Sequence, residues 1–170
     1  MYQLIFKYTI MKKIILTVAA IFSFGVASAQ DMKFGVKAGL DMVSAKIDGG
    51  GSISATGFYA GGFLEFGIAD GFAIQPGLNY HAASKDQMDL NFISIPVLVK
   101  YTIADSFNLL AGPSLFYNMD SDAQDKTAFN LDLGVSYDIT ENFFVEPRYA
   151  LGLTGDVKVS HFLIGVGYKF

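Results

Sequence analysis

The sequence has no cysteine and no tryptophan, and only four of its 170 residues are proline. Without cysteine, the chain cannot form a disulfide-stapled scaffold, a thiolate metal site or a lipid-modified cysteine anchor. Charged residues make up 16% of the chain and hydrophobic residues 52%. Apart from one segment near the N-terminus, no apolar run is long enough to cross a bilayer as a helix. The apolar residues must therefore follow another pattern.

The apolar segment near the N-terminus has the three parts of a secretory signal peptide. Met11-Lys12-Lys13 is a basic start, residues 14–26 are apolar, and Ala27-Ser28-Ala29 is a small-residue cleavage pattern. A retained membrane anchor would need a longer stretch without a cleavage site. We predict a signal peptide over residues 1–29, with Met11 as the true start, and a mature domain over residues 30–170.

Removal of this segment would leave an acidic protein. Lys7, Lys12 and Lys13 would be lost from the 12 basic residues, so nine would remain against 16 acidic residues, a net charge of −7. Nucleic-acid binding needs cationic groups that neutralise phosphates, and docking on anionic lipid headgroups needs them too. The charge therefore argues against both classes of partner.

From Lys33 onward, apolar residues alternate with glycine, polar or charged residues, which is typical of β-strands. Residues 129–139 show the pattern most clearly, with an apolar residue at every odd position. We predict an all-β fold, a transmembrane up-and-down antiparallel β-barrel of about eight strands. The expected strands are 33–44, 57–68, 72–82, 90–102, 107–118, 128–139, 143–154 and 158–170.

A short motif recurs at intervals of roughly 35 residues, which suits two strands and their connection. Its copies are Ile68-Ala69-Asp70-Gly71-Phe72, residues 103–107 and residues 139–143. Each has polar residues between two apolar strand ends, so each predicts a tight hairpin turn. Longer polar segments at 45–56, 82–89 and 119–127 alternate with these turns and are predicted to be loops at the outer end of the barrel.

The distribution of charge decides which face of the barrel meets lipid. A soluble barrel of the lipocalin type keeps its apolar face inside. Here the apolar face carries essentially no charge, as lipid requires, whereas the other face holds acids and bases in balance. We therefore place the polar face inside, where it serves either as an ion-pair plug or as the selectivity ring of a narrow pore. The predicted interior network is Lys37, Glu65, Lys100, Asp132, Asp138, Glu146 and Arg148.

The four prolines fall inside predicted strands, where each should cost a hydrogen bond between strands. We expect bulges there, or strand ends that extend beyond their neighbours. The prolines are Pro76, Pro96, Pro113 and Pro147.

Few other residues suggest chemistry. His81 and His161 are predicted to point inward near the outer rim, but their strands should lie well apart around the wall. Residues 120–125 resemble the start of a calcium loop but lack its glycine and final glutamate. Gly49-Gly50-Gly51 does not lie between a strand and a helix, as a phosphate-binding loop would. We predict no catalytic, cofactor-binding or metal-binding residue, and no enzyme activity.

Three segments resemble a known family. The ending Tyr168-Lys169-Phe170 looks like the C-terminal signal read by the barrel-insertion machinery, with Val166, Tyr168 and Phe170 as its apolar positions. Residues 95–101 and 148–154 resemble strand motifs of the PorT-like outer-membrane β-barrel family. The resemblance implies an outer-membrane location, with outer-membrane lipids and the insertion machinery as partners, and supplies no catalytic residues.

The expected function is a structural or surface-interaction role, in which the outer loops contact an unknown surface or periplasmic partner, since loops on a rigid scaffold usually carry binding. A small porin-like channel is the alternative. An outer-membrane lipid-modifying enzyme is a third and weaker hypothesis.

Overall fold

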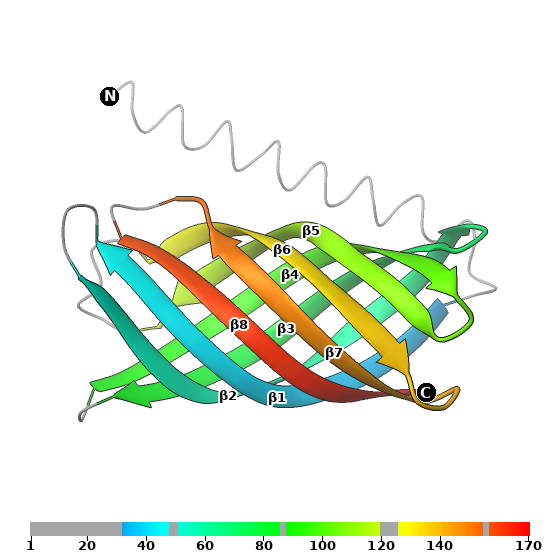
Figure 1. The fold of residues 1–170 in the computed structure, drawn as a ribbon, viewed down its shortest axis with the longest axis horizontal. Helices are drawn as coiled ribbons and strands as arrows, with labels where there is room; N and C mark the ends of the chain where they lie inside the picture. The colour runs from blue at the N-terminus through cyan, green and yellow to red at the C-terminus, as the bar shows by residue number, and fades with distance from the viewer. Residues whose placement is uncertain (1–31, 48–50, 86–87, 120–125, 155–156) are drawn as a thin grey trace, which may run out of the picture.

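A computed structural model describes residues 32–47, 51–85, 88–119, 126–154 and 157–170. Eight antiparallel strands form one closed barrel, in which each strand pairs with its neighbours in sequence and β8 pairs with β1 (Figure 1). The predicted fold class and strand number are confirmed. The strands are β1 (Met32–Ile47), β2 (Ser52–Ala69), β3 (Phe72–Lys85), β4 (Met88–Ala104), β5 (Phe107–Asn118), β6 (Thr127–Asp138), β7 (Phe143–Gly152) and β8 (Val157–Lys169).

No helix among the described residues is long and apolar enough to cross a membrane.

The three copies of the repeated motif form the three short turns at one end of the barrel, here called the turn end. β2–β3 and β4–β5 turn through two residues each, and Gly71 in the first turn has φ of 73°, a conformation that favours glycine. The register shifts just before both turns, between Gly67 and Ala69 and between Thr102 and Ala104. In the first two copies the sequence repeat is therefore also a structural repeat of bulge and turn, whereas the third copy forms a longer turn over residues 139–142 without a register shift.

The opposite end, here called the loop end, differs from the sequence prediction. Most of the first predicted loop, residues 45–56, is strand, because β1 continues to Ile47 and β2 begins at Ser52, with Lys46 opposite Ser52. Residues 48–50 lie outside the described residues. Residues 82–89 are also mostly strand, since Lys85 pairs with Met88. The sequence prediction ended the strands too early because it assigned the polar residues near their ends to loops. Of the third predicted loop, residues 120–125 lie outside the described residues.

The two faces of the wall are as the charge pattern predicted. Large apolar side chains cover the outside, including Phe58, Leu78 and Val166, and the polar side chains point into the lumen. Aromatic residues lie near strand ends on the outer face, where they suit the two membrane interfaces. They include Phe72, Tyr80, Tyr101, Phe107, Tyr117, Tyr137, Phe143, Tyr149, Phe162 and Phe170.

The prolines show neither of the expected irregularities. Pairing is interrupted beside Pro76 toward β2, beside Pro96 toward β3, beside Pro113 toward β4 and beside Pro147 toward β6. In each case it resumes in the same register, so no bulge forms at the proline. Each proline keeps a paired partner on its other side. Because proline lacks only the N–H, it weakens the ladder toward one neighbour without shifting the register.

Candidate functional site: the barrel interior

Ion pairs fill the middle of the lumen, and the first of them joins two strands that are not neighbours. The Lys37 ammonium on β1 lies 2.7 Å from the Glu146 carboxylate on β7. The Arg148 guanidinium, also on β7, lies 3.0 Å from Asp132 and 3.6 Å from Glu146. Asp132 also accepts a hydrogen bond from Ser114 at 2.5 Å. All these groups are buried, so the charges neutralise one another where water is scarce.

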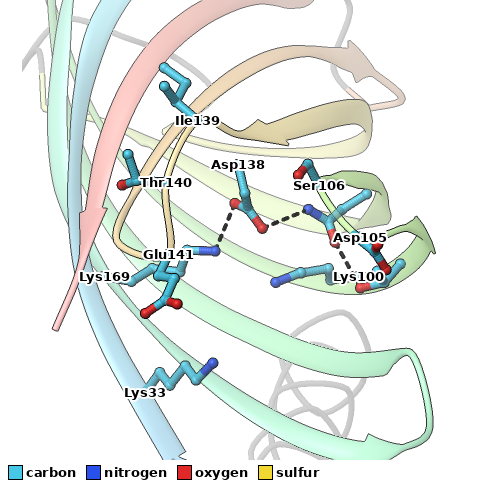
Figure 2. A pocket seen from close by; sticks show the side chains of 11 residues that line it. Lys33, Lys100, Asp105, Ser106, Asp138, Ile139, Thr140, Glu141 and Lys169 are labelled. Carbon is cyan, nitrogen blue, oxygen red and sulfur yellow. Dashed lines mark hydrogen bonds and ion pairs between the residues drawn. The ribbon is translucent and has the colours of Figure 1, made fainter.

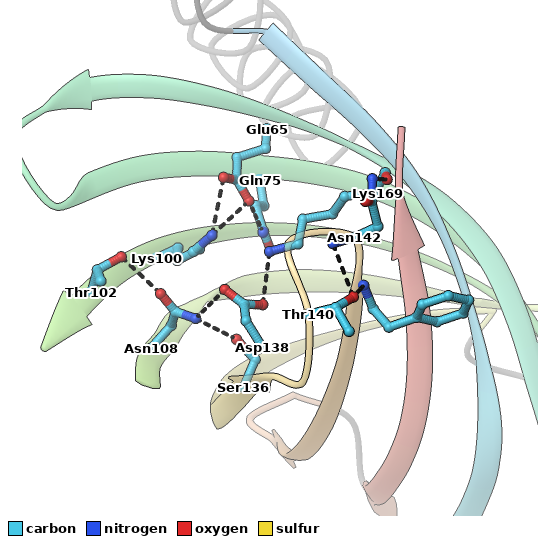
Figure 3. Close-up of polar contacts among 11 residues, drawn as sticks. Glu65, Gln75, Lys100, Thr102, Asn108, Ser136, Asp138, Thr140, Asn142 and Lys169 are labelled. Atoms are coloured by element: carbon cyan, nitrogen blue, oxygen red, sulfur yellow. Dashed lines mark hydrogen bonds and ion pairs between the residues drawn. The ribbon is translucent and has the colours of Figure 1, made fainter. Parts of the chain in front are cut away.

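A second polar layer lies toward the turn end (Figure 3). Lys100 donates to both oxygens of Glu65 at 3.0 Å, and Gln75 donates to Glu65 at 2.6 Å. Nearby, Lys169 donates to Asp138 at 2.7 Å. The first set joins β2, β3 and β4, and the second joins β8 to β6. Both sides of the lumen are therefore neutralised at this level.

Each of the seven residues of the predicted interior network faces the lumen, and each belongs to one of these ion pairs. The structure adds two charged residues that were not assigned to the network. Lys169 completes the pair with Asp138. Asp41 lies in a separate cluster nearer the loop end, where it contacts histidines instead of lysine or arginine.

The two histidines meet, contrary to the expectation that their strands keep them apart. His81 on β3 and His161 on β8 have ring centroids 5.7 Å apart. Their Nδ1 atoms lie 2.8 and 3.0 Å from the same oxygen, Oδ2 of Asp41 on β1. A lumen this narrow is filled by side chains, so residues on well-separated strands touch across it. β3 and β8 are not neighbours in the wall, but their histidine side chains meet inside the lumen.

Aromatic side chains fill much of the remaining lumen. Phe63 and Phe144 pack edge to face at 5.7 Å, and Phe116 stacks on His161 at 4.3 Å. The Lys37 ammonium lies 5.4 Å from the centre of the Phe63 ring. The sequence prediction missed these inward aromatics because it treated the inward face as glycine and polar residues. The described interior therefore contains packed aromatic rings as well as charged side chains.

The inward glycines make room for these rings. A Cβ on Gly35 would meet the Phe63 ring, and one on Gly167 would meet the Phe144 ring. Tyr59 occupies the space beside Gly165 in the same way. Glycine recurring on the inward face opposite a large residue is the sequence signal that would have predicted this packing.

The turn end opens into a cavity of about 480 Å³ (Figure 2). Lys33, Lys100 and Lys169 face it, together with Asp138 and the turn residues Asp105 and Glu141. Its lining is mixed in sign, so it selects neither cations nor anions clearly. The Lys37–Glu146 and Arg148–Asp132 pairs are buried beyond it, toward the middle of the barrel.

The C-terminal strand has its predicted faces and is held at the turn end. Val166 and Phe170 are exposed on the outer wall, and Phe170 stacks on Phe34 with ring centroids 4.4 Å apart. The Asn142 side chain donates to the Lys169 carbonyl at 2.7 Å, and Figure 1 shows the C-terminus beside the β6–β7 turn. Recognition of Val166, Tyr168 and Phe170 by insertion machinery stays a prediction.

A closed eight-stranded barrel with an apolar outer wall and a packed polar lumen defines a small transmembrane β-barrel of the outer membrane. The family model described as "Outer membrane protein beta-barrel domain" matches residues 14–170, and the chain belongs to this family. The outer membrane is therefore its location. A comparison with curated protein sequences finds no match.

Solved structures share the fold. The chain is similar to Ail, the attachment invasion locus protein of Yersinia pestis, with 18% identity, a TM-score of 0.62, and coverage of 83% of this chain and all of Ail. It is also similar to Neisserial surface protein A, with 21% identity, a TM-score of 0.53 and coverage of 83% and 100%. A designed transmembrane barrel has 14% identity, a TM-score of 0.52 and coverage of 81% and 95%.

Proposed function

We propose that the protein is a closed outer-membrane barrel whose role is structural or interactive, not conductive or catalytic. The observation that carries this proposal is the filled lumen. Buried ion pairs of Lys37 and Arg148 and the packed rings of Phe63 and Phe116 occupy its cross-section. A barrel of eight strands has an interior just wide enough for side chains, so little space is left for water or solute.

Planar-bilayer recording tests the closed lumen against the channel alternative. The pure folded protein should insert without discrete, reproducible conductance steps. Folding and insertion are checked by the heat-dependent mobility shift of a barrel on a denaturing gel. Reproducible unit steps from folded protein would overturn the plug, and would favour a pore that begins at the cavity near Lys100 and Lys169.

One arrangement of side chains resembles a catalytic site, but the serine in it is buried. Asp41, His81 and Ser94 form a hydrogen-bonded chain, with His81 Nε2 2.8 Å from Ser94 Oγ, in the order used by serine hydrolases. Ser94 is only 1% exposed and faces the packed lumen. The cavity lined by described residues lies at the other end of the barrel, and the burial of this hydroxyl argues against access by an acyl substrate.

A surface interaction is supported by a lysine pair at the loop end. Lys46 on β1 and Lys158 on β8 are directly opposite each other and both are exposed. Like charges in this arrangement repel, so an anionic partner would stabilise the pair. Ail has been crystallised with the heparin analogue sucrose octasulfate. We propose an anionic surface polysaccharide as the partner of this chain, bound at this local pair despite the acidic total charge.

Titration with sucrose octasulfate tests this partner class. Lys46→Gln/Lys158→Gln should weaken binding by roughly two- to thirtyfold, since each exposed charge contributes about 0.2–1 kcal/mol. Lys126→Gln is the matched control. Lys126 is also exposed at the loop end, but it lies between β5 and β6, away from the β1–β8 pair. No binding by wild type, or equal loss in the control, would overturn the polysaccharide proposal while leaving the closed barrel intact.

Residues 1–29 are proposed to be a cleaved signal peptide, and membership in the PorT-like group remains a finer hypothesis within the established family. Mass spectrometry of protein from outer-membrane fractions should give a mature N-terminus at Gln30. A mature chain that begins at Met1 or Met11 would contradict the signal peptide.

A further inference from the structure

Asp41 differs from the other carboxylates of the lumen. Glu65, Asp132, Asp138 and Glu146 each pair with a lysine or an arginine. Asp41 is fully buried, and its partners in the described part of the chain are two imidazoles. A buried carboxylate is costly without a positive partner, and neutral imidazole supplies none. The positive charge that balances Asp41 must therefore come from a protonated histidine or from a bound cation.

The donor atoms of this cluster converge on one point. Nδ1 of His81 and Nδ1 of His161 lie 2.8 and 3.0 Å from Asp41 Oδ2, and one donor atom from each residue lies within 4.8 Å of the others. Zinc binds imidazole nitrogen at about 2.0–2.1 Å in a tetrahedral shell, which sets neighbouring donors roughly 3.3 Å apart. Small side-chain shifts would open this cluster into three corners of such a shell.

We propose that Asp41, His81 and His161 bind a first-row transition-metal ion, with Zn²⁺ as the reference ion and water at the fourth position. Imidazole with carboxylate suits zinc, copper, nickel or iron, whereas calcium and magnesium prefer all-oxygen shells. The donor set comes from β1, β3 and β8, so the metal would tie β3 to the β1–β8 seam that closes the barrel.

The surrounding hydrogen bonds suit this assignment. Metal binding through Nδ1 requires each imidazole to carry its proton on Nε2, and a ligating histidine usually donates that proton to a fixed acceptor. Ser94 Oγ lies 2.8 Å from His81 Nε2 and is itself held by Asn79, which donates to it at 3.1 Å. Ser94 is therefore the positioning residue that orients His81. The ring of Phe116, stacked on His161, holds the second imidazole in place.

Metal analysis of untagged, refolded barrel tests the proposal. After exposure to Zn²⁺ or Co²⁺ and gel filtration, wild type should retain one ion per chain, and Co²⁺ should show visible ligand-field absorption. Asp41→Asn, His81→Gln and His161→Gln should each weaken binding at least about 100-fold, and Ser94→Ala about tenfold. Glu65→Gln is the control, because it alters a buried ion pair away from the cluster and should leave metal binding unchanged.

Two outcomes would overturn the proposal. One is wild-type protein that retains no stoichiometric metal, and the other is binding that survives all three ligand substitutions. If a ligand variant fails to give the folded mobility on a gel, imidazole ¹⁵N NMR of wild type decides instead. Zn²⁺ should move the ring protons from Nδ1 to Nε2. Unchanged Nδ1–H signals with Zn²⁺ present would identify a hydrogen-bonded Asp–His–His cluster only.

Discussion

The Lys37 ammonium lies 2.7 Å from the Glu146 carboxylate, although 109 residues separate them in sequence. β1 and β7 are not neighbours in the wall, so this contact crosses the lumen. Both side chains are 2% exposed, and Arg148 approaches the same carboxylate at 3.6 Å. Glu146 is thus the acid shared by two buried bases, and the balance of charge at mid-barrel depends on it.

Glu146→Gln should destabilise the barrel by about 3–5 kcal/mol, because it leaves Lys37 buried without its carboxylate. Urea unfolding in phospholipid vesicles measures the loss of unfolding free energy. Lys37→Met/Glu146→Leu should recover most of it, since removing both charges removes the penalty. Asp105→Asn, in an exposed turn, is the control. Wild-type stability in the single variant would contradict the role of the pair.

Gly39→Ala should disrupt the wall where β1 and β8 pair. Its Cβ would meet the carbonyl of Ile164 and the Cα of Gly165, which are backbone atoms that cannot rotate away. We expect a loss of about 1–3 kcal/mol or more, as for other overpacked sites. Gly62→Ala is a matched control on β2, because its Cβ would make only ordinary contact, 3.6 Å from the Gly35 carbonyl. The same vesicle assay serves for both, and equal stability of the two variants would contradict the steric argument.

The alternation of residues predicted the fold because a strand at a lipid boundary must separate its faces completely. Eight strands and three short turns follow from it, and so does the inward position of residues such as Glu146 and Arg148. The limits of β1 and β2 did not follow. Ser52 and Ser54 look like loop residues, but they extend the barrel beyond the apolar band, where polar outward positions are tolerated.

Contacts across the lumen could not be predicted from the sequence, because they depend on the diameter of the barrel. Alternation places His81 and His161 inside, yet it does not show that Asp41 lies between them. Inward rings such as Phe63 were missed for a related reason. An apolar residue on the inward face breaks the binary pattern, and only the glycine opposite it shows that there is room.

The orientation of the barrel predicts which ends are reachable from outside the cell. The chain has no cysteine, so any labelling of a single-cysteine variant comes from the introduced residue. Lys158→Cys at the loop end should react with a membrane-impermeant maleimide on intact cells. Asp105→Cys in a short turn should react only after the outer membrane is permeabilised, because short turns face the periplasm in such barrels. The reverse labelling pattern would show that the barrel is inserted the other way.

Phe170 has two roles that can be separated. It stacks on Phe34 and its N–H donates to the Phe34 carbonyl at 2.9 Å, so it closes the β1–β8 seam at the turn end. It is also the last position of the predicted insertion signal. Phe34→Ala removes the same ring contact but leaves the C-terminus unchanged, which makes it the matched control.

Phe170→Ala and Phe34→Ala should therefore both slow refolding in detergent, because both lose the stacked pair, worth about 0.5–1.5 kcal/mol beyond area burial. Phe170→Ala also loses its edge contact with Tyr168, so the detergent rates supply the baseline for the comparison in cells. In cells they should differ, since only Phe170→Ala alters the residue that the insertion machinery would read. Pulse-labelling followed by the heat-dependent gel shift measures how fast folded barrel appears. Equal assembly rates for the two variants in cells would reduce Phe170 to a packing residue. A specific delay in Phe170→Ala would establish that the closing strand is also a recognition signal.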